Sequence, residues 1–265
     1  MTIDFHTHCF SDEIAVKAIP KLAEAGGIQP FTDGTVSGLK SSMQSSGIHV
    51  SVVQPIATKP AQTTVINRWA ASIKDRQIVP FGTIHPEYEH WQEEIIWLSN
   101  QGIKGVKFHP DYQRFFVDDE KLFPIYEMLF SMNFIVLFHA GVDIAFSEPY
   151  HCTPKRLQKV LDMFPRAVII AAHMGGYMYW DDVEKYLVGR NIYMDTSFSF
   201  KKLGKKNMEK MIKAHGADKI LFASDSPWGD QAKEIMNIQS LSLSDKERGA
   251  ILSGNACKLL SNSEI

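Results

Sequence analysis

The sequence has few cysteines, no long hydrophobic run and almost no net charge. Its three cysteines (Cys9, Cys152 and Cys257) are far apart and odd in number, so they cannot all pair in a disulfide framework. We therefore expect free thiols and a cytoplasmic protein. The 28 basic and 30 acidic residues leave a net charge of −2, which gives no sign of nucleic acid or an anionic membrane as a partner. The apolar stretches are of strand length, too short to span a bilayer.

The chain also lacks low-complexity segments and an interior linker. It begins directly with the strand-like TIDFHTH, without the basic and apolar regions of a signal peptide, so we expect no such peptide. With 265 residues and 45% hydrophobic residues, it can bury a large core. We expect one domain that spans residues 1–265.

Short apolar segments alternate with amphipathic segments along the whole chain, which predicts strands alternating with helices. The predicted strands are 2–8, 48–56, 78–85, 103–109, 134–140, 167–173, 191–196 and 219–225. Clear helical patterns cover 63–75, 89–102, 119–133, 153–164 and 206–216, and 245–260 is expected to form a closing helix or helix pair. Eight strands favour a (β/α)8 barrel over an open doubly wound sheet, which usually has five or six strands. The glycine-rich segment 26–38 is expected to form a loop over the barrel mouth.

Histidines and one acid stand at the ends of these predicted strands. His6 and His8 end the first, His139 the fifth and His173 the sixth, while Asp225 ends the eighth. Because parallel strands of a barrel end at the same rim, these side chains are expected to meet there. Imidazole and carboxylate groups are typical ligands of divalent metals. The pattern therefore predicts a metal site at the barrel mouth.

Alternation along a strand places Asp4, His6 and His8 on one face, which would point into the barrel. His6 and His8 can then reach one ion, although two hydrogen-bonded core histidines are the simpler alternative. We expect Asp4, one step deeper, to support the site rather than bind metal. Cys9 would point the opposite way from His8.

The fourth predicted strand ends with Lys107 and His109, which share a face. A buried lysine requires a partner, because an unpaired ammonium is costly to bury. Lys107 could pair with a barrel acid, or react with carbon dioxide to form a carbamate that bridges two metals. His109 could contact substrate, bind metal or hold a loop.

Other strand ends carry candidate site residues of less certain role. His85 ends the third strand and could contact substrate or make a structural hydrogen bond. Asp195 ends the seventh, where a supporting hydrogen bond is expected. The small residues after His139 and His173 either leave room for substrate or serve turn geometry. Asp225 could bind metal and accept a proton from bound water, whereas helix capping fits Asp230 or Ser226 better.

Taken together, these motifs resemble the amidohydrolase superfamily, specifically its amidohydrolase-related (amidohydrolase 2) group. The resemblance covers nearly the whole chain. It is carried by the first-strand His6 and His8, His139 in LFHAG, His173 in AAHMGG, Asp225 in ASDSPWGD and the closing ILSGNACKLL.

The resemblance implies a distorted (β/α)8 barrel with one or two divalent metals at its mouth. In mononuclear relatives the ligands would be His6, His8, His139 and Asp225, and His173 would polarise the substrate or move protons. In binuclear relatives His173 is also a ligand, and Lys107 stands where the bridging residue belongs. Zinc is the expected metal, with manganese as the alternative.

Three functions compete on this basis. The first is hydrolysis of an amide, ester or lactone of a small molecule, with Asp225 and His173 as catalytic residues and His109 and His85 binding substrate. The second is non-oxidative decarboxylation of an unsaturated or aromatic acid; enzymes of that kind are usually longer, and Arg114 is the nearest candidate to grip a carboxylate. The third is a metal-binding barrel without catalysis. Each is compatible with a homo-oligomer.

Overall fold

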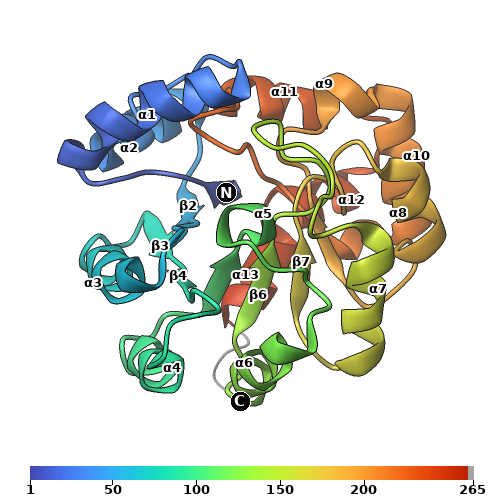
Figure 1. The fold of residues 1–265 in the computed structure, drawn as a ribbon. Coiled ribbons are helices and arrows are strands. Elements are labelled where there is room, and N and C mark those ends of the chain that lie inside the picture. The colour runs from blue at the N-terminus through green and yellow to red at the C-terminus, as the bar shows by residue number, and fades with distance from the viewer. Residues whose placement is uncertain (262–265) are drawn as a thin grey trace.

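Short parallel strands form the centre of the molecule in a computed structural model that describes residues 1–261 (Figure 1). The strands are β1 (Ile3–Thr7), β2 (Val50–Val53), β3 (Ile78–Pro80), β4 (Gly82–Thr83), β5 (Gly105–Phe108), β6 (Ile135–Phe138), β7 (Ile169–Ala171), β8 (Tyr193–Asp195) and β9 (Ile220–Leu221). Each of them lies within one of the eight predicted segments. There are nine strands in eight segments because β3 and β4 are two parts of one interrupted strand.

These strands close into a ring. β1, β2 and β3 pair in parallel in that order, and so do β4 through β9. Backbone hydrogen bonds join the two ends: Phe5 N donates to Phe222 O at 2.9 Å, and Asp225 N donates to His6 O at 2.9 Å. Phe81 N donates to Val53 O at 2.9 Å across the β3–β4 break. The ring confirms the predicted (β/α)8 barrel and excludes an open doubly wound sheet.

Helices surround the strands on the outside (Figure 1). The α-helices are α1 (Asp12–Gly26), α2 (Val36–Ser46), α3 (Thr63–Ser72), α4 (Trp91–Asn100), α5 (Pro110–Gln113), α6 (Phe123–Ser131), α7 (Pro154–Met163), α8 (Trp180–Tyr186), α9 (Phe200–Leu203), α10 (Lys205–His215), α11 (Gln231–Ser240), α12 (Asp245–Gly249) and α13 (Asn255–Ser261). Short 3-10 turns are η1 (Pro60–Gln62), η2 (Glu120–Leu122) and η3 (Ala217–Lys219), and η4 (Ala250–Gly254) is a π-helical turn. None of the helices in residues 1–261 has the length and apolar character needed to cross a membrane.

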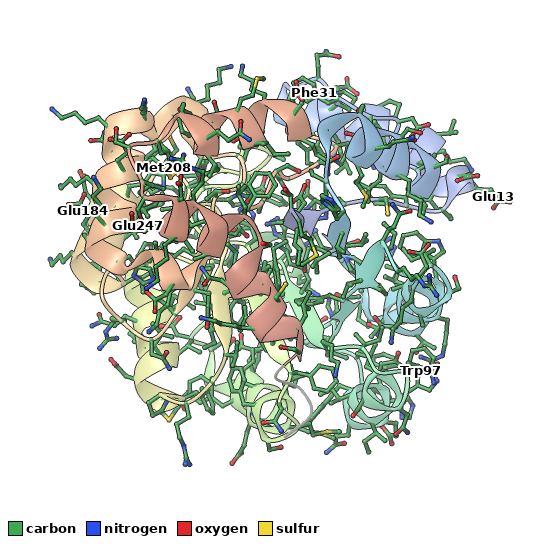
Figure 2. The ribbon with its side chains drawn as sticks, turned by 180° about the vertical axis from the view of Figure 1, so that it is seen from behind. Glu13, Phe31, Trp97, Glu184, Met208 and Glu247 are labelled. Atoms are coloured by element: carbon green, nitrogen blue, oxygen red, sulfur yellow. The ribbon has the colours of Figure 1, made fainter. Side chains whose placement is uncertain are left out.

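The helices agree with the predicted helical segments, with local differences. Residues 119–133 begin as the 3-10 turn η2 before α6, and the closing segment divides into α12, η4 and α13. The glycine-rich segment is shorter as a loop than expected, because Thr35 caps α2 and the helix begins at Val36. Seen from behind, Glu13 projects outward from α1, and Trp97 marks α4 (Figure 2). Arg68 of α3 lies 3.2 Å from the centre of the Trp97 ring and ties these two helices together.

Two apolar cores hold the barrel together. The inner core includes Phe5 of β1, Leu137 of β6 and Ile170 of β7, and Leu259 of α13 packs against it. The larger outer core fills the space between the strands and the surrounding helices. Burial of both faces explains why the strands read as continuous apolar runs.

His6 and His8 face the same cavity as expected, but the expectation that Asp4 shares their face is wrong. Phe5 belongs to the inner core, whereas Asp4 accepts hydrogen bonds from Ser224 N at 3.0 Å and from Gln231 Nε2 of α11 at 2.8 Å. The register of β1 against β2 shifts between Asp4 and Thr7. Such a bulge re-aims the side chains that follow it, so His6 turns toward the barrel mouth although Asp4 faces the helix layer.

Glu234 on α11 provides a test of this helix layer. Burial, together with the nearby charges of Asp4 and Asp230, raises its pKa from 4.5 to about 7, against the opposing effects of Asn237 and Lys233. As the pH rises, Glu234 therefore ionises in the unfolded chain before it does so in the folded protein. The folded state accordingly loses stability relative to the unfolded state between about pH 4.5 and about pH 7. We expect Glu234→Gln to raise the melting temperature relative to the wild type, with a gain that grows over this interval and is constant above it.

Thermal unfolding of the two proteins between pH 4.5 and 8 measures this gain. Glu127→Gln, on the exposed face of α6, is the control and should show no comparable pH-dependent gain. An equal melting-temperature difference at every pH would contradict the assignment.

Candidate metal centre and active-site cavity

A cavity of about 870 Å³ opens where the strands end. Seven of the eight residues predicted from the sequence to form the site line it: His6, His8, Lys107, His109, His139, His173 and Asp225. They follow or end β1, β5, β6, β7 and β9, so the common direction of the strands brings them together. His85 is not among the lining residues; its Nδ1 accepts a hydrogen bond from Glu87 N at 3.2 Å.

Three of these residues present donor atoms to one point. His6 Nε2 and His8 Nε2 are 3.1 Å apart, and Asp225 Oδ1 lies 3.4 Å from the first and 3.3 Å from the second. Ligands about 2.1 Å from a tetrahedral ion are roughly 3.4 Å from one another. The two imidazole rings are inclined at 68°, so their in-plane lone pairs can converge. These three residues, His6, His8 and Asp225, form a metal triangle: their donor atoms have the spacing and orientation of a metal site.

The hydrogen bonds on the far sides of the two rings fix their protons. His6 Nδ1 donates to the carboxylate of Asp195 at 2.9 Å, and His8 Nδ1 donates to the carbonyl oxygen of Gln54 at 2.8 Å. In the neutral ring, each Nε2 must then carry a lone pair. Burial and the nearby Lys107 charge lower the pKa of His6 well below its ordinary value, so this ring is neutral at neutral pH. Three electron-rich atoms within 3.4 Å suit a cation, and the donor set fits a divalent metal.

A second group of histidine and acid side chains does not have this geometry. His109, His139 and Asp143 lie close enough to share an ion. However, the rings of His109 and His139 are stacked, with centroids 4.1 Å apart and planes at 12°. Ring lone pairs lie in the ring plane, so two parallel stacked rings cannot both aim at one ion. His109 Nδ1 also accepts from Tyr112 N at 3.5 Å, which leaves its Nε2–H to donate to Asp143 at 3.0 Å.

His139 nevertheless keeps one free nitrogen. His173 Nδ1 donates to Ser197 O at 3.1 Å, so His173 Nε2 accepts from His139 Nδ1 at 3.1 Å. His139 Nε2 is then a buried lone pair without a hydrogen-bond partner. The donor atoms of His139, however, are not within 4.8 Å of those of all three residues His6, His8 and Asp225. The role of His139 as a further ligand of that site therefore stays a prediction.

Lys107 is fully buried beside the metal triangle. Its Nζ donates to His6 Nε2 at 3.2 Å, and burial lowers its pKa to about 8, although Asp195, Asp225 and Asp143 act in the opposite direction. A metal that takes the His6 lone pair removes this acceptor. Lys107 then needs an anionic partner, or loses its charge.

Backbone conformation places two of these residues. His173 and Asp225 have φ of 59° and 65°, in the left-handed region that non-glycine residues seldom occupy.

The expectation that the small residues after His139 leave room for substrate is not met. A Cβ on Gly141, whose φ is 87°, would lie 2.2 Å from Tyr177 N, so the backbone of the neighbouring loop fills this space.

Two acids complete the site. Asp195 makes the expected supporting hydrogen bond to His6, and it also accepts from the backbone N–H of His173 at 3.0 Å. Asp143 lines the cavity and was missed, because it stands in a loop where no strand periodicity applies; its spacing of four residues from His139 is the one available signal. Arg114, by contrast, is exposed and does not line the cavity, and neither does any other arginine in residues 1–261.

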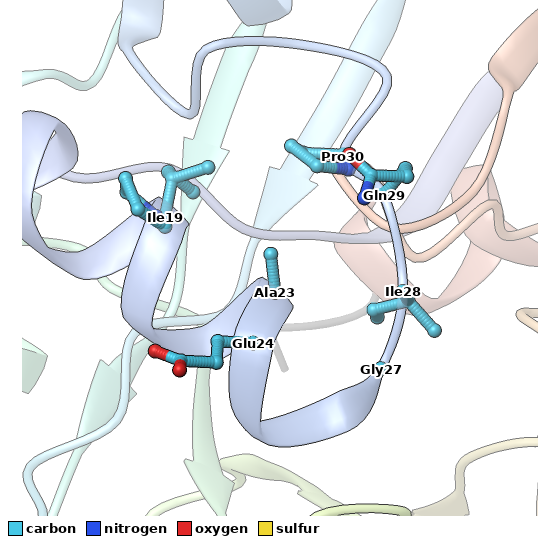
Figure 3. Close-up of a pocket in the computed structure, with 8 residues that line it drawn as sticks. Ile19, Ala23, Glu24, Gly27, Ile28, Gln29 and Pro30 are labelled. Atoms are coloured by element: carbon cyan, nitrogen blue, oxygen red, sulfur yellow. The ribbon is translucent and has the colours of Figure 1, made fainter.

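A separate hollow lies between α1 and the segment that follows it (Figure 3). It is lined mostly by apolar side chains, and Glu24 is the one charged residue among Ile19, Pro20, Ala23, Glu24, Gly27, Ile28, Gln29 and Pro30. It contains no histidine, so the chemistry belongs to the cavity at the strand ends.

The family follows from this combination of fold and site. Residues 3–261 match the model of the amidohydrolase family described as Amidohydro_2, so the chain belongs to that family, as the sequence motifs predicted. No curated protein matches the chain.

Solved structures share the barrel at low sequence identity. An uncharacterized TIM-barrel protein, Bb4693 from Bordetella bronchiseptica, has a TM-score of 0.78 at 18% identity, over 99% of each chain. 5-Carboxyvanillate decarboxylase LigW from Sphingomonas paucimobilis has 0.73 at 14%, over 98% of each chain. The 5-carboxyvanillate decarboxylase from Novosphingobium aromaticivorans, complexed with manganese, has 0.73 at 16%, over 98% of this chain and 96% of its own. Each match spans nearly the whole of both chains, so the likeness extends over the entire barrel.

The role of Asp195 can be tested through metal affinity. Its Oδ1 accepts from the backbone N–H groups of His173 and Ser197 and from the Ser197 hydroxyl, so in Asp195→Asn the amide NH2 would face His6. His6 would then shift its proton to Nε2 and lose the lone pair that binds metal. We expect affinity for zinc or manganese to fall roughly 10–100-fold in competition titrations with a chelator.

Asp118→Asn is the matched control, since Asp118 is also a buried carboxylate but pairs with Arg156 and Lys159. It should leave metal affinity unchanged. Equal affinity of Asp195→Asn and the wild type would contradict the proton assignment at His6.

Proposed function

We propose that the chain is a metal-dependent enzyme that removes the carboxyl group of a small aromatic or unsaturated carboxylic acid as carbon dioxide. The observation that carries this proposal is the division of the cavity. Its inner end gathers the metal triangle and buried Lys107, while most of its remaining wall is apolar. Hydrolysis of an amide, ester or lactone, the first function predicted from the sequence, becomes the second candidate.

The apolar wall suits a flat or unsaturated substrate. It includes aliphatic and aromatic side chains from several loops: Ile14, Leu22, Ile28, Ile56, Val65, Ile66, Trp69, Val142, Phe198 and Trp228. A ring could pack against these groups while its carboxylate reaches the charged end. A localised carboxylate charge is unfavourable in apolar surroundings. Loss of carbon dioxide disperses that charge, so an apolar wall favours the reaction. The likeness to two decarboxylases supports this choice.

The residues divide the chemistry between them. His6, His8 and Asp225 would hold the metal with His139, and the metal would act as a Lewis acid toward a substrate oxygen. Lys107 would pair with the substrate carboxylate. The second oxygen of Asp225, Oδ2, would take a proton from water and pass it to the carbon that bears the carboxylate. The carbon–carbon bond then breaks, its electron pair returns to the substrate, and carbon dioxide leaves. His173, held by Ser197, would orient the substrate.

Three imidazole nitrogens and one carboxylate oxygen suit either zinc or manganese. Zinc was the sequence-based expectation; the manganese in the Novosphingobium decarboxylase makes manganese the first ion to test. We propose a cytoplasmic enzyme with a small-molecule substrate.

Hydrolysis is retained because of Lys107. In binuclear relatives a carbamate at this position bridges two ions, and the amine lies 3.2 Å from His6 Nε2. Two metal ions per chain, with a carbamate on Lys107, would favour hydrolysis. One ion would favour decarboxylation.

The experiment is turnover by manganese- and zinc-loaded protein on a panel of hydroxybenzoic and unsaturated acids, amides, esters and lactones. We expect carbon dioxide from at least one acid, without incorporation of labelled water oxygen into the other product. Asp225→Asn should reduce this rate roughly 100-fold or more, because it removes the proton carrier.

Asp118→Asn is the control variant and should keep the wild-type rate, because Asp118 lies outside the cavity and pairs with Arg156 and Lys159. Incorporation of water oxygen into a cleaved amide, ester or lactone would replace decarboxylation by hydrolysis. No turnover of any class by metal-loaded protein would favour a metal-binding barrel without catalysis. Near-normal turnover by Asp225→Asn would refute its role.

A further inference from the structure

Asp143 presents a carboxylate to the cavity that the proposed chemistry does not use. It follows β6 in the loop after His139, and 9% of its surface is exposed. Two donors hold it in place: His109 Nε2–H at 3.0 Å on Oδ2, and Ala145 N–H at 2.8 Å on Oδ1. Each carboxylate oxygen can accept a further hydrogen bond. Asp143 is therefore oriented but not saturated.

The neighbouring His139 places Asp143 beside the proposed metal. His139 Nε2, which would face the metal, is buried and lies 3.9 Å from Asp143 Oδ2. A substrate held at the metal would therefore bring its own donor groups within reach of the Asp143 carboxylate. The stacked rings of His109 and His139 exclude a metal ion shared by these two side chains.

Nearby charge restricts the kind of donor. Lys107 lies in the same cavity, and a divalent ion bound by His6, His8 and Asp225 would add two further positive charges. These positive charges would repel an ammonium group on the substrate, whereas they would not repel a neutral hydroxyl or amino group. The site is thus suited to a neutral donor on the substrate.

We propose that Asp143 is a specificity residue that accepts a hydrogen bond from a hydroxyl or aromatic amino group of the substrate, with His109 as its positioning residue. The proposal rests on the proposed function, because it takes the cavity as the substrate site. The substrate then carries two recognition groups: a carboxylate for the metal and Lys107, and a neutral donor for Asp143.

Binding of simple probes tests this assignment without turnover. The probes are benzoate and its 2-, 3- and 4-hydroxy isomers, titrated calorimetrically into manganese-loaded protein. We expect at least one hydroxy isomer to bind the wild type tenfold or more tightly than benzoate. In Asp143→Ala this ratio should fall close to one, because the acceptor is gone and the carboxylate contacts remain.

Two further variants separate recognition from folding. Asp143→Asn keeps the volume but replaces an acceptor oxygen by a donor, so it should also lose the preference. His109→Gln can still donate to Asp143 and should keep the preference, whereas His109→Leu should lose it. Asp118→Asn, the control outside the cavity, should bind all four probes as the wild type does.

Several outcomes would overturn the proposal. One is a wild type that does not prefer any hydroxy isomer. Another is a preference that survives in both Asp143→Ala and Asp143→Asn, since it would then come from chelation of the metal by the probe. Failure of the proposed function is a separate result, namely the absence of carbon dioxide release from every acid tested.

Discussion

The hydrogen bond from His6 Nδ1 to Asp195 holds the site in its metal-binding form. At 2.9 Å and fully buried, it keeps the His6 proton on the side away from the cavity. The Nε2 lone pair must then face His8 Nε2 and Asp225, and repulsion among these atoms is relieved only by a proton or a cation. Asp195 also accepts the backbone N–H of His173, so one carboxylate at the end of β8 orients residues from two other strands.

The barrel makes this arrangement possible because its strands deliver their ends to one rim. Closure between β9 and β1 brings Asp225 beside His6 and His8, although more than 200 residues separate them in the chain. The bulge in β1 then re-aims His6, and the left-handed backbone at Asp225 turns its side chain back toward the cavity. The outer helices supply the packing that holds these unusual conformations.

Much of the fold and most of the site could be predicted from the sequence. Apolar runs of strand length alternate with amphipathic segments, and this periodicity located every strand of the barrel. Polar residues that end such runs, including Lys107 and His139, were found by the same pattern. His85 also ends a run, but it does not line the cavity, and its Nδ1 accepts a hydrogen bond from Glu87 N instead. Asp143 stands in a loop, where periodicity carries no information about direction.

The sequence by itself determined the family, the barrel and which residue types stand at the strand ends, because these depend on local periodicity and on residue type. Only the tertiary structure decided which nitrogen of each histidine is free, which histidine Asp195 holds and whether the second histidine group can hold an ion. Those properties depend on ring orientation and on hydrogen-bond partners far away in the chain. His109 and His139 make the difference plain: their residue types suggest a metal site, and their parallel stacking excludes a shared ion.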